Sequence, residues 1–560
     1  MVDLKANPYF LDESQVKWVR ETLDAMNTED KIGQLFCETL WNCTDEEEEV
    51  IFSEIKPGGV MFRPNPAEKI RDYTERLQAK SDIPLLIAAN LERGGNGGIT
   101  DGTYYGTQMQ VAATDDDECG KRLGLVAGAE GAAVGFNWSF APIVDIDYNF
   151  LSTVTNNRTY GSDPDTVIQM AKGYIEGAHT YNMATTIKHF PGDGMDFRDQ
   201  HKVASINTKS VEEWDETYGK VYRTLIEAGT DAVMAAHIKL PSYSKFYDSS
   251  LTDEKVLPGS LDSNLLQKLL REKLGFNGLI VSDDTHMTGF MVSMEREKAV
   301  PYCIAAGVDM FLFTINHHED IGYMRKGVEK GIITPERLDE AVTRILALKA
   351  KLRLHEMSND RRFLGMDKES MREKHKLWAK ECANKAVTLV KDREGLLPLS
   401  PEKYKNILLC ELDNNAEGRY DNDPQYNAFK KALMKEGFHV KELDLDEMPG
   451  LGITGMGIGP LKEKYDLMIY FIGAKAGYRI CWRSIVCGEI ACYTKEIPAV
   501  AVSFNSPYML MDLPMVGTYI NAYSESGYVR EAVVEKLMGQ SPFLGKSPVD
   551  PFCGMWDLPL

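Results

Sequence analysis

The sequence has few cysteines, and they are not spaced like metal ligands or a disulfide framework. It holds 10 cysteines in 560 residues, and no Cys-x-x-Cys pair occurs. A disulfide scaffold is therefore excluded, and Cys481, Cys487 and Cys492 have no histidine nearby at zinc spacing. We expect most of the cysteines to be buried as small apolar groups.

Long apolar runs are also missing. No stretch of ~18 apolar residues occurs, which is the length that a membrane-spanning helix needs. The N-terminus, MVDLKANPYFLDESQ, has no basic region followed by an apolar run, so no secretory signal is expected. These absences predict a cytoplasmic protein with no membrane partner.

Positive charge is scarce relative to negative charge. Lys and Arg number 63 against 84 Asp and Glu, for a formal net charge of −21. Such a chain repels phosphate backbones, so we expect no nucleic-acid partner. Hydrophobic residues make up 43% of the chain, which is an ordinary globular proportion. A chain of this length predicts two or more domains.

Short apolar runs alternate with amphipathic stretches through the first 350 residues. The runs are dense in β-branched residues without clean alternation, as in parallel strands that are buried on both faces. They begin at Ile32, Gly58, Pro84, Phe140, Ala184, Asp231, Gly278 and Asp309. Eight such strands predict an α/β fold of the (β/α)₈ TIM-like barrel type, with a doubly wound sheet as the alternative.

The rest of the chain divides into two further parts. Residues 351–385 are charged and helix-prone, which suits a helical linker after a barrel over 1–350. Residues 386–560 contain the apolar runs KNILLCEL, YDLMIYFIG and AVAVSF between helical stretches. We therefore expect a smaller C-terminal α/β sandwich domain.

Polar residues gather at the C-terminal ends of the barrel runs, the face at which barrel enzymes carry their active sites. They are Glu92, Asp145, Asp147, Lys188, His189, His237, Asp283 and Asp284. A strand-end cap would explain one of them. Eight together favour a functional site.

The densest polar segment is KHFPGDGMDFRDQH, from Lys188 to His201. Gly192 and Gly194 permit a tight turn after the strand. Asp199 and His201 are spaced so that the carboxylate can orient the imidazole, which makes a tunable proton donor near neutral pH. An acidic surface loop with an incidental histidine is the alternative.

A second cluster ends the run GLIVSDD with Asp283 and Asp284. Adjacent strand residues point to opposite faces, so at most one of the two is expected to face the barrel mouth. A carboxylate there could bind a metal, act as a base or attack an electrophilic carbon. The spacing of Asp283 and Asp284 does not indicate which of these three roles the carboxylate has.

These segments resemble family 3 glycoside hydrolases, particularly the bacterial β-N-acetylglucosaminidase branch. Residues 188–194 are similar to the family's KHFPGHG loop, residues 199–201 to its D-x-H, and residues 275–284 to its GFDGLVVSDD segment. The opening LDAMNTEDKIGQLF, NNRTYGSDP, AVMAAHI and the C-terminal AVSFNSPYMLMDLP also look like the family. The resemblance covers nearly the whole chain in order.

The resemblance implies a retaining glycosidase that forms a covalent glycosyl-enzyme intermediate. By motif, Asp283 would be the nucleophile, and His201, oriented by Asp199, the general acid/base. Asp284 is the alternative nucleophile, although a structural role suits it better. The implied sugar-binding residues are Arg158, Lys188, His189, Met234 and His237, with Asn90 and Glu92 in the segment that usually reads D-x-E-G-G.

Two positions depart from the family pattern. The second histidine of the KHFPGHG loop is Asp193 here, and the aspartate of D-x-E-G-G is Asn90. A contact to the C4 or C6 hydroxyl of the sugar is therefore expected to differ, and Glu92 or Asp193 is the candidate to replace it.

The resemblance predicts an exo-acting β-N-acetylhexosaminidase that needs no metal or cofactor and acts on a small carbohydrate or glycopeptide. The alternatives are a β-glucosidase or β-xylosidase of the same family, and a phosphorylase in which phosphate replaces water. From other classes, a metal-dependent barrel hydrolase and a non-catalytic sugar-binding protein remain. The oligomeric state stays open.

Overall fold

The computed structural model describes all residues except 1, 40–44, 357–368, 413–423, 444–457 and 475–492. The chain forms two compact units. The first comprises Met1–Tyr105, Gly120–Asn149 and Pro164–Lys376, and the second comprises Gly106–Cys119, Phe150–Asp163 and Leu377–Leu560. The boundaries expected at 350 and 385 stay predictions, and residues 357–368 of the expected linker lie outside the described residues.

An eight-stranded parallel sheet forms the centre of the first unit, in the order β10-β1-β2-β3-β4-β5-β7-β9. Six strands fall within the apolar runs of the sequence, β1 begins in the run from Ile32 and extends beyond it, and β4 lies just before the run from Phe140. The strands are β1 (Phe36–Thr39), β2 (Gly59–Met61), β3 (Leu86–Ala89), β4 (Trp138–Ser139), β5 (Ala184–Phe190), β7 (Ala232–Ala235), β9 (Leu279–Ser282) and β10 (Phe311–Leu312).

The two ends of this sheet meet, which makes it a barrel. β10 pairs with β1, and Val281 of β9 forms a parallel bridge with Met310, next to β10. Leu312 N donates to Ser282 Oγ at 2.9 Å across the same junction. The predicted (β/α)₈ barrel is therefore confirmed, and the doubly wound alternative is wrong because an open sheet leaves its edge strands unpaired.

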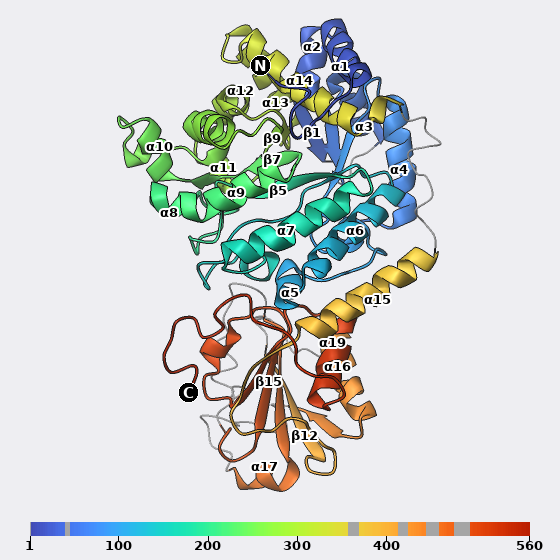
Figure 1. The fold of residues 1–560 in the computed structure, drawn as a ribbon, viewed down its shortest axis with the longest axis vertical. Helices are drawn as coiled ribbons and strands as arrows, with labels where there is room; N and C mark the ends of the chain where they lie inside the picture. Colours follow the sequence, from blue (N-terminus) through green and yellow to red (C-terminus); the bar gives the residue numbers. More distant parts are fainter. Residues whose placement is uncertain (1, 40–44, 357–368, 413–423, 444–457, 475–492) are drawn as a thin grey trace. The chain divides into compact units, whose positions relative to one another are not determined.

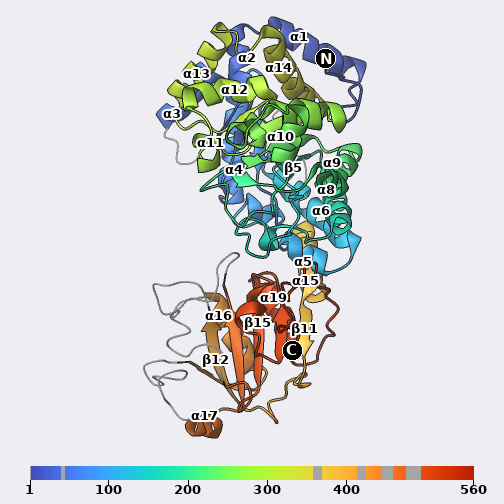
Figure 2. The same ribbon diagram turned by 90° about the vertical axis from the view of Figure 1, so that its left-hand side faces the viewer.

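Helices surround this sheet (Figures 1 and 2). The longer ones are α1 (Glu13–Ala25), α4 (Ala67–Lys80), α6 (Asp117–Ala133), α7 (Pro164–His179), α9 (Tyr218–Glu227), η6 (Asn264–Lys273), α12 (Arg296–Ala306), α13 (His317–Glu329) and α14 (Pro335–Lys351). The short ones are α2 (Thr28–Gln34), α3 (Asp45–Val50), η1 (Ile51–Ile55), η2 (Gly95–Gly97), α8 (Val211–Glu216), α10 (Pro241–Tyr247), η4 (Asp253–Lys255), η5 (Gly259–Leu261), α11 (Thr288–Met291) and η7 (Leu354–Glu356). A small parallel pair joins β6 (Ser205–Ile206) to β8 (Ile238–Lys239).

A buried ionic cluster anchors the strand that carries Asp283. Asp309 is fully buried, and its carboxylate lies 2.6 Å from Arg271, 2.6 Å from Arg337 and 3.2 Å from Arg344. Ile280 N of β9 donates to the same carboxylate at 2.9 Å. Burial opposes the charge on Asp309, but the three guanidinium groups outweigh it and hold the pKa below its ordinary value.

Asp309→Asn is expected to lower the free energy of unfolding by ~3–5 kcal/mol, because it leaves the buried Arg271 guanidinium without its counter-charge and leaves Arg337 and Arg344 to share Glu340. Urea unfolding followed by circular dichroism measures the change. Asp253→Asn is the matched control, since Asp253 pairs with Lys245 at the surface, where an ion pair contributes at most about 1 kcal/mol. Equal stability of the two variants would show that the cluster does not stabilise the barrel.

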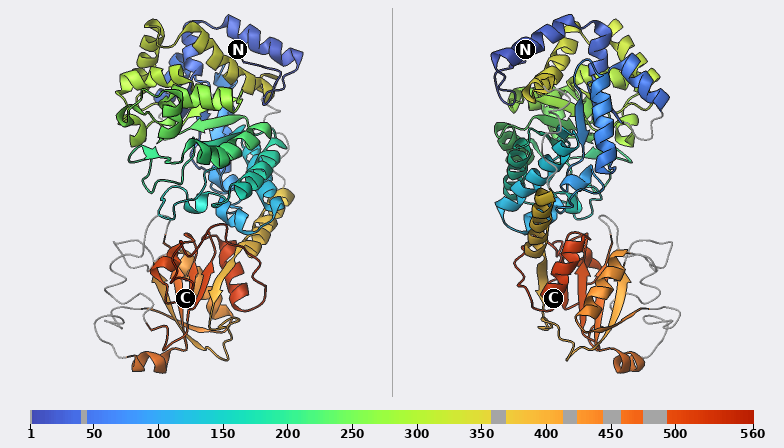
Figure 3. Two further views of the ribbon diagram at one scale, coloured as in Figure 1. Left: turned by 60° about the vertical axis from the view of Figure 1, so that its left-hand side comes forward. Right: turned by 90° about the vertical axis from the view of Figure 1, so that its right-hand side faces the viewer.

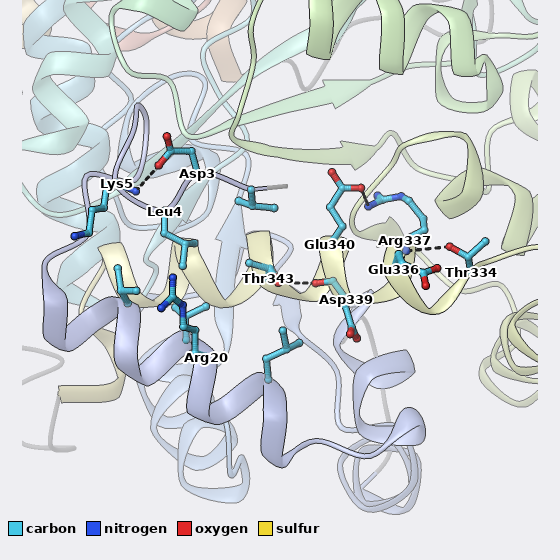
Figure 4. Close-up of a pocket in the computed structure, with 14 residues that line it drawn as sticks. Asp3, Leu4, Lys5, Arg20, Thr334, Glu336, Arg337, Asp339, Glu340 and Thr343 are labelled. Atoms are coloured by element: carbon cyan, nitrogen blue, oxygen red, sulfur yellow. Dashed lines mark hydrogen bonds and ion pairs between the residues drawn. The ribbon is translucent and has the colours of Figure 1, made fainter.

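A pocket of about 980 Å³ lies between the N-terminal segment, α1 and α14 (Figure 4). Its lining combines apolar side chains of α1 with charged ones of α14, among them Arg337 and Glu340, whose side chains are 3.2 Å apart. None of the residues expected in the active site lines it. The expected active-site residues lie instead around the ends of the barrel strands.

The second unit contains a six-stranded sheet in the order β11-β16-β15-β14-β12-β13. β11 is antiparallel to β16, and the other pairs are parallel. The strands are β11 (Thr388–Asp392), β12 (Asn406–Leu412), β13 (His439–Glu442), β14 (Leu467–Ile472), β15 (Ala499–Ser503) and β16 (Thr518–Asn521). The helices are α5 (Gln108–Ala113), η3 (Asn156–Arg158), α16 (Pro424–Lys435), α17 (Gly459–Lys464), η9 (Met509–Asp512) and α19 (Gly527–Leu537), and α15 (Glu369–Ala386) leads into β11.

Both faces of this sheet are covered (Figure 3). Side chains of α16 and α19, such as Phe429 and Val533, pack with Phe471 on one face. Leu461 of α17 and Leu510 of η9 belong to the cluster on the other. This layering confirms the predicted α/β sandwich.

Candidate active site

Asp283 directly follows β9 and is 5% exposed. Its N–H donates to Ala235 O of β7 at 2.9 Å, and its Oδ1 accepts from Asp284 N at 2.8 Å. Its Oδ2 is buried and accepts no hydrogen bond from the described residues. One carboxylate oxygen is thus held in place while the other is left for a ligand at the mouth of the barrel.

Asp199 and His201 form a tight pair on the loop after β5. His201 Nδ1 lies 2.6 Å from Asp199 Oδ1, and the His201 N–H donates to the same oxygen at 2.8 Å. Partial burial opposes the charge on Asp199, but the hydrogen bonds from His201 outweigh it and hold the pKa of the carboxyl below its ordinary value. The His201 side chain is 52% exposed. A charged carboxylate therefore fixes an imidazole that solvent or substrate can reach.

The chain turns sharply to bring this pair back to the mouth. Gly192 and Gly194 have φ of 118° and 101°, a region that disfavours residues with a Cβ. A Cβ on Gly192 would lie 2.2 Å from the Tyr218 ring. Both glycines of the predicted turn are therefore required by the path of the loop.

Lys188 of β5 links the two residues of the departing D-x-E-G-G segment. Its Nζ donates to Asn90 Oδ1 at 3.2 Å and lies 2.8 Å from Glu92 Oε1. Only 4% of the Lys188 side chain and 12% of the Glu92 side chain are exposed. The ammonium group and the carboxylate thus form a buried ion pair at the ends of β3 and β5. Glu92 and Asn90 both contact the same Lys188 ammonium group.

His189, Asp145 and Asp193 form a second buried group. Asp145 Oδ2 lies 2.6 Å from His189 Nδ1, while its Oδ1 accepts from the backbone N–H groups of His189 and Asp193. Burial opposes the charge on Asp145, but the charge and hydrogen bonds of His189 outweigh this effect and hold the pKa of the carboxyl below its ordinary value. Asp193 is thereby tied to this group through its own backbone.

Met234 and His237 come from β7 and the residues after it, and both are buried. His237 Nδ1 lies 2.9 Å from Ser260 Oγ, and its Nε2 lies 3.0 Å from Asp284 O. The His237 N–H donates to Gln200 Oε1 at 3.0 Å. Burial lowers the pKa of His237 despite the nearby Asp283 charge. Its contacts are those of a residue that joins the Asp283 and His201 segments.

Asp284 departs from the expectation that at most one of the two aspartates faces the mouth. Its Oδ2 lies 3.9 Å from Arg63 Nη2, and Arg63 follows β2, which is not a neighbour of β9 in the sheet. The alternation of strand side chains does not apply because β9 ends at Ser282.

Sequence reasoning also missed His286. Asp284-Thr285-His286 repeats the D-x-H spacing of residues 199–201, and that repetition is the signal by which it could have been found. Its Nδ1 lies 2.6 Å from Asp284 Oδ1.

Arg158 belongs to η3 of the second unit. Its Nη1 donates to Val154 O at 3.4 Å. Its role in sugar binding stays a prediction.

Comparison with known proteins shows which family the chain belongs to. Residues 27–348 match the glycosyl hydrolase family 3 N terminal domain. A "Beta-N-acetylglucosaminidase/beta-glucosidase" of Cellulomonas fimi is 43% identical over the full length of both chains. The chain belongs to glycosyl hydrolase family 3. The predicted family and the predicted glycosidase class are both confirmed.

Other relatives cover different parts of the chain. A "Beta-hexosaminidase" of Tolumonas auensis is 32% identical over 48% of this chain and 78% of its own length. The structure of a "Beta-glucoside phosphorylase BglX" is 44% identical, covers 99% of both chains and superposes with a TM-score of 0.92. A family 3 β-N-acetylglucosaminidase of Paenibacillus sp., at 22% identity and a TM-score of 0.78, shows the shared fold.

Three further findings concern the residues that the structure describes. Among the described residues, no helix is long and apolar enough to cross a membrane. Within the same part of the chain, no three His, Cys, Asp or Glu side chains are grouped as metal ligands would be. Five of the six described cysteines are buried, and Cys553 is partly exposed.

Proposed function

We propose that this family 3 enzyme is a retaining, exo-acting β-glycosidase in which Asp283 is the nucleophile and His201, oriented by Asp199, is the acid/base. The observation that carries the proposal is the buried, unbonded Oδ2 of Asp283 at the barrel mouth. A loop that hydrogen-bonds to the segment after Asp283 presents the Asp199–His201 pair. We place the reaction in the cytoplasm, on a small carbohydrate or glycopeptide.

In the first step, Asp283 Oδ2 attacks the anomeric carbon while the His201 imidazolium protonates the departing oxygen. The proton leaves from Nε2, because Nδ1 faces Asp199. In the second step, the neutral imidazole takes a proton from the acceptor, the acceptor oxygen attacks the anomeric carbon, and the bond from that carbon to Asp283 breaks. Asp199 stabilises the imidazolium, since its carboxyl stays charged.

We propose that the group around Lys188 determines which sugar is bound. Lys188, Glu92 and Asn90 offer an ammonium group, a carboxylate and an amide in contact with one another, which suits adjacent sugar hydroxyls. His189 and Met234 are proposed to complete this subsite. Terminal β-linked N-acetylglucosamine is the proposed substrate, and glucose is the second, because the Cellulomonas relative is named for both sugars.

Phosphate is a second candidate for the acceptor. A neutral imidazole base repels an incoming phosphate less than a carboxylate base does. The relative named a β-glucoside phosphorylase also spans nearly the whole chain.

A panel of nitrophenyl β-glycosides of N-acetylglucosamine, N-acetylgalactosamine, glucose and xylose, each with and without inorganic phosphate, tests both candidates. We expect the N-acetylglucosaminide or the glucoside to have the largest kcat/KM. Hydrolysis predicts free sugar at the same rate in both buffers, and phosphorolysis predicts a sugar phosphate and a faster rate in phosphate. Absence of turnover on all four sugars would contradict the proposal.

A further inference from the structure

The second Asp-x-His pair has no part in the steps above. The His286 N–H donates to Asp284 Oδ1 at 2.9 Å, and its Nδ1 lies 2.6 Å from that oxygen. The corresponding distances for His201 and Asp199 are 2.8 and 2.6 Å. The His286 side chain is 47% exposed. In the described part of the chain, its Nε2 makes no hydrogen bond.

This pair is tied to both catalytic segments. Asp284 follows Asp283 and donates its N–H to the Asp283 carboxylate at 2.8 Å. Two residues beyond His286, Thr288 N donates to His201 O at 3.2 Å, and Gly289 N donates to Gln200 O at 3.1 Å. The two imidazoles therefore sit on segments that are bonded directly to each other.

Arg63 adds a second cationic group from across the barrel. β2, which precedes it, is separated from β9 by β10 and β1 in the sheet. An Arg63 to Asp284 separation of 3.9 Å therefore means that the two side chains meet over the mouth rather than on the barrel wall. The Arg63 side chain is 43% exposed, so its guanidinium can also reach a ligand.

The balance of charge at this place changes during the reaction. Partial burial opposes the charge on Asp284, but the hydrogen bonds from His286 outweigh it and hold the pKa of the carboxyl below its ordinary value. In the glycosyl-enzyme, Asp283 is an uncharged ester. Arg63 and His286 then face a single carboxylate, Asp284, so less negative charge repels an anionic acceptor when it arrives.

We propose that His286 and Arg63, positioned by Asp284, bind the acceptor of the second step and that this acceptor is inorganic phosphate. The inference rests on the proposed function. A phosphate oxygen attacks the anomeric carbon, the bond from that carbon to Asp283 breaks, and its electron pair returns to Asp283 as a carboxylate. His286 Nε2–H and the Arg63 guanidinium donate to the other phosphate oxygens, as imidazolium and guanidinium groups do at oxyanions.

Competition between two acceptors for one intermediate tests this subsite. The enzyme receives a dinitrophenyl β-glycoside with fixed inorganic phosphate and methanol, and the ratio of glycosyl phosphate to methyl glycoside is measured. We expect His286→Gln and Arg63→Gln each to lower this ratio by about tenfold, since each removes one charged hydrogen bond to phosphate that methanol does not use. His439→Gln on β13 and Arg325→Gln on α13 are exposed matched controls.

The ratio is internal, so a poorly folded fraction of a variant does not change it. Unchanged ratios in both variants would overturn the inference, and so would wild-type enzyme that forms methyl glycoside but no glycosyl phosphate. Wild-type enzyme that releases no dinitrophenol would instead refute the proposed function, and the inference would fall with it.

Discussion

Replacing Asp283 by glycine is expected to lower kcat/KM on a nitrophenyl β-glycoside by at least about 10³-fold, because it removes the group that forms the covalent bond. No neighbouring carboxylate can take over. Asp284 is paired with His286 and Arg63, and Asp145 is bonded to His189. Steady-state kinetics measures the loss.

Azide separates a chemical loss from a folding defect in this variant. Asp283 makes few contacts through its side chain, chiefly the hydrogen bond from Asp284 N, so glycine is expected to leave the barrel folded. Azide can then enter the vacated space and attack from the face that the carboxylate used. We expect partial recovery of the rate and a glycosyl azide of α configuration. Asp248→Gly, at a partly exposed position, is the control and should not respond to azide.

A 2-deoxy-2-fluoro glycosyl fluoride tests the same assignment in the wild-type enzyme. We expect a sugar adduct on Asp283, located by peptide mass mapping, since the fluorine slows hydrolysis of the intermediate. An adduct on Asp284 would refute the assignment. Absence of any adduct together with strong inhibition by a thiazoline would favour attack by the substrate's own acetamido group.

His201→Ala is expected to lower kcat/KM by ~10²–10⁴-fold on substrates with poor leaving groups, because the departing oxygen loses its proton donor. Activated aryl glycosides leave without protonation, so their loss should be far smaller. A plot of log kcat/KM against the pKa of the leaving phenol should therefore steepen in the variant. His439→Ala, at an exposed site on β13, should leave the slope unchanged.

Asp199→Asn should be milder than His201→Ala. The imidazole remains, but the 2.6 Å contact of Nδ1 with Asp199 Oδ1 loses its charge, which lowers the basicity of the ring. A loss of equal size across the whole leaving-group series in His201→Ala would show that His201 positions the substrate rather than donating a proton.

Much of the barrel could be predicted from the sequence. The apolar runs around Gly278 and Asp309 became β9 and β10, because strands buried on both faces need continuous apolar sequence. The turn at Gly192 and Gly194 could also be predicted, since left-handed backbone there admits little else. In each case the cause is local, so a few neighbouring residues carry the information.

Individual contacts within the site were predicted only between residues that are close in sequence. Asp199 and His201 are two positions apart, and their contact follows from that spacing. The same spacing brings Asp284 and His286 into contact, but Asp284 was expected to follow the alternation of β9, which ends at Ser282. Asp284 lies two residues beyond the end of the strand, and its side chain meets Arg63.

Other features depend on residues that are far apart in the chain, and only the tertiary structure decided them. Closure of the barrel needs Val281 to meet Met310. The link of Lys188 to Asn90 and Glu92 joins positions about one hundred residues apart, and Arg63 reaches Asp284 from a strand on another side of the sheet. Spacing in sequence therefore determined the strands, the turn and the first Asp–His pair, whereas the electrostatic surroundings of Asp283 were set when distant strand ends met at one mouth.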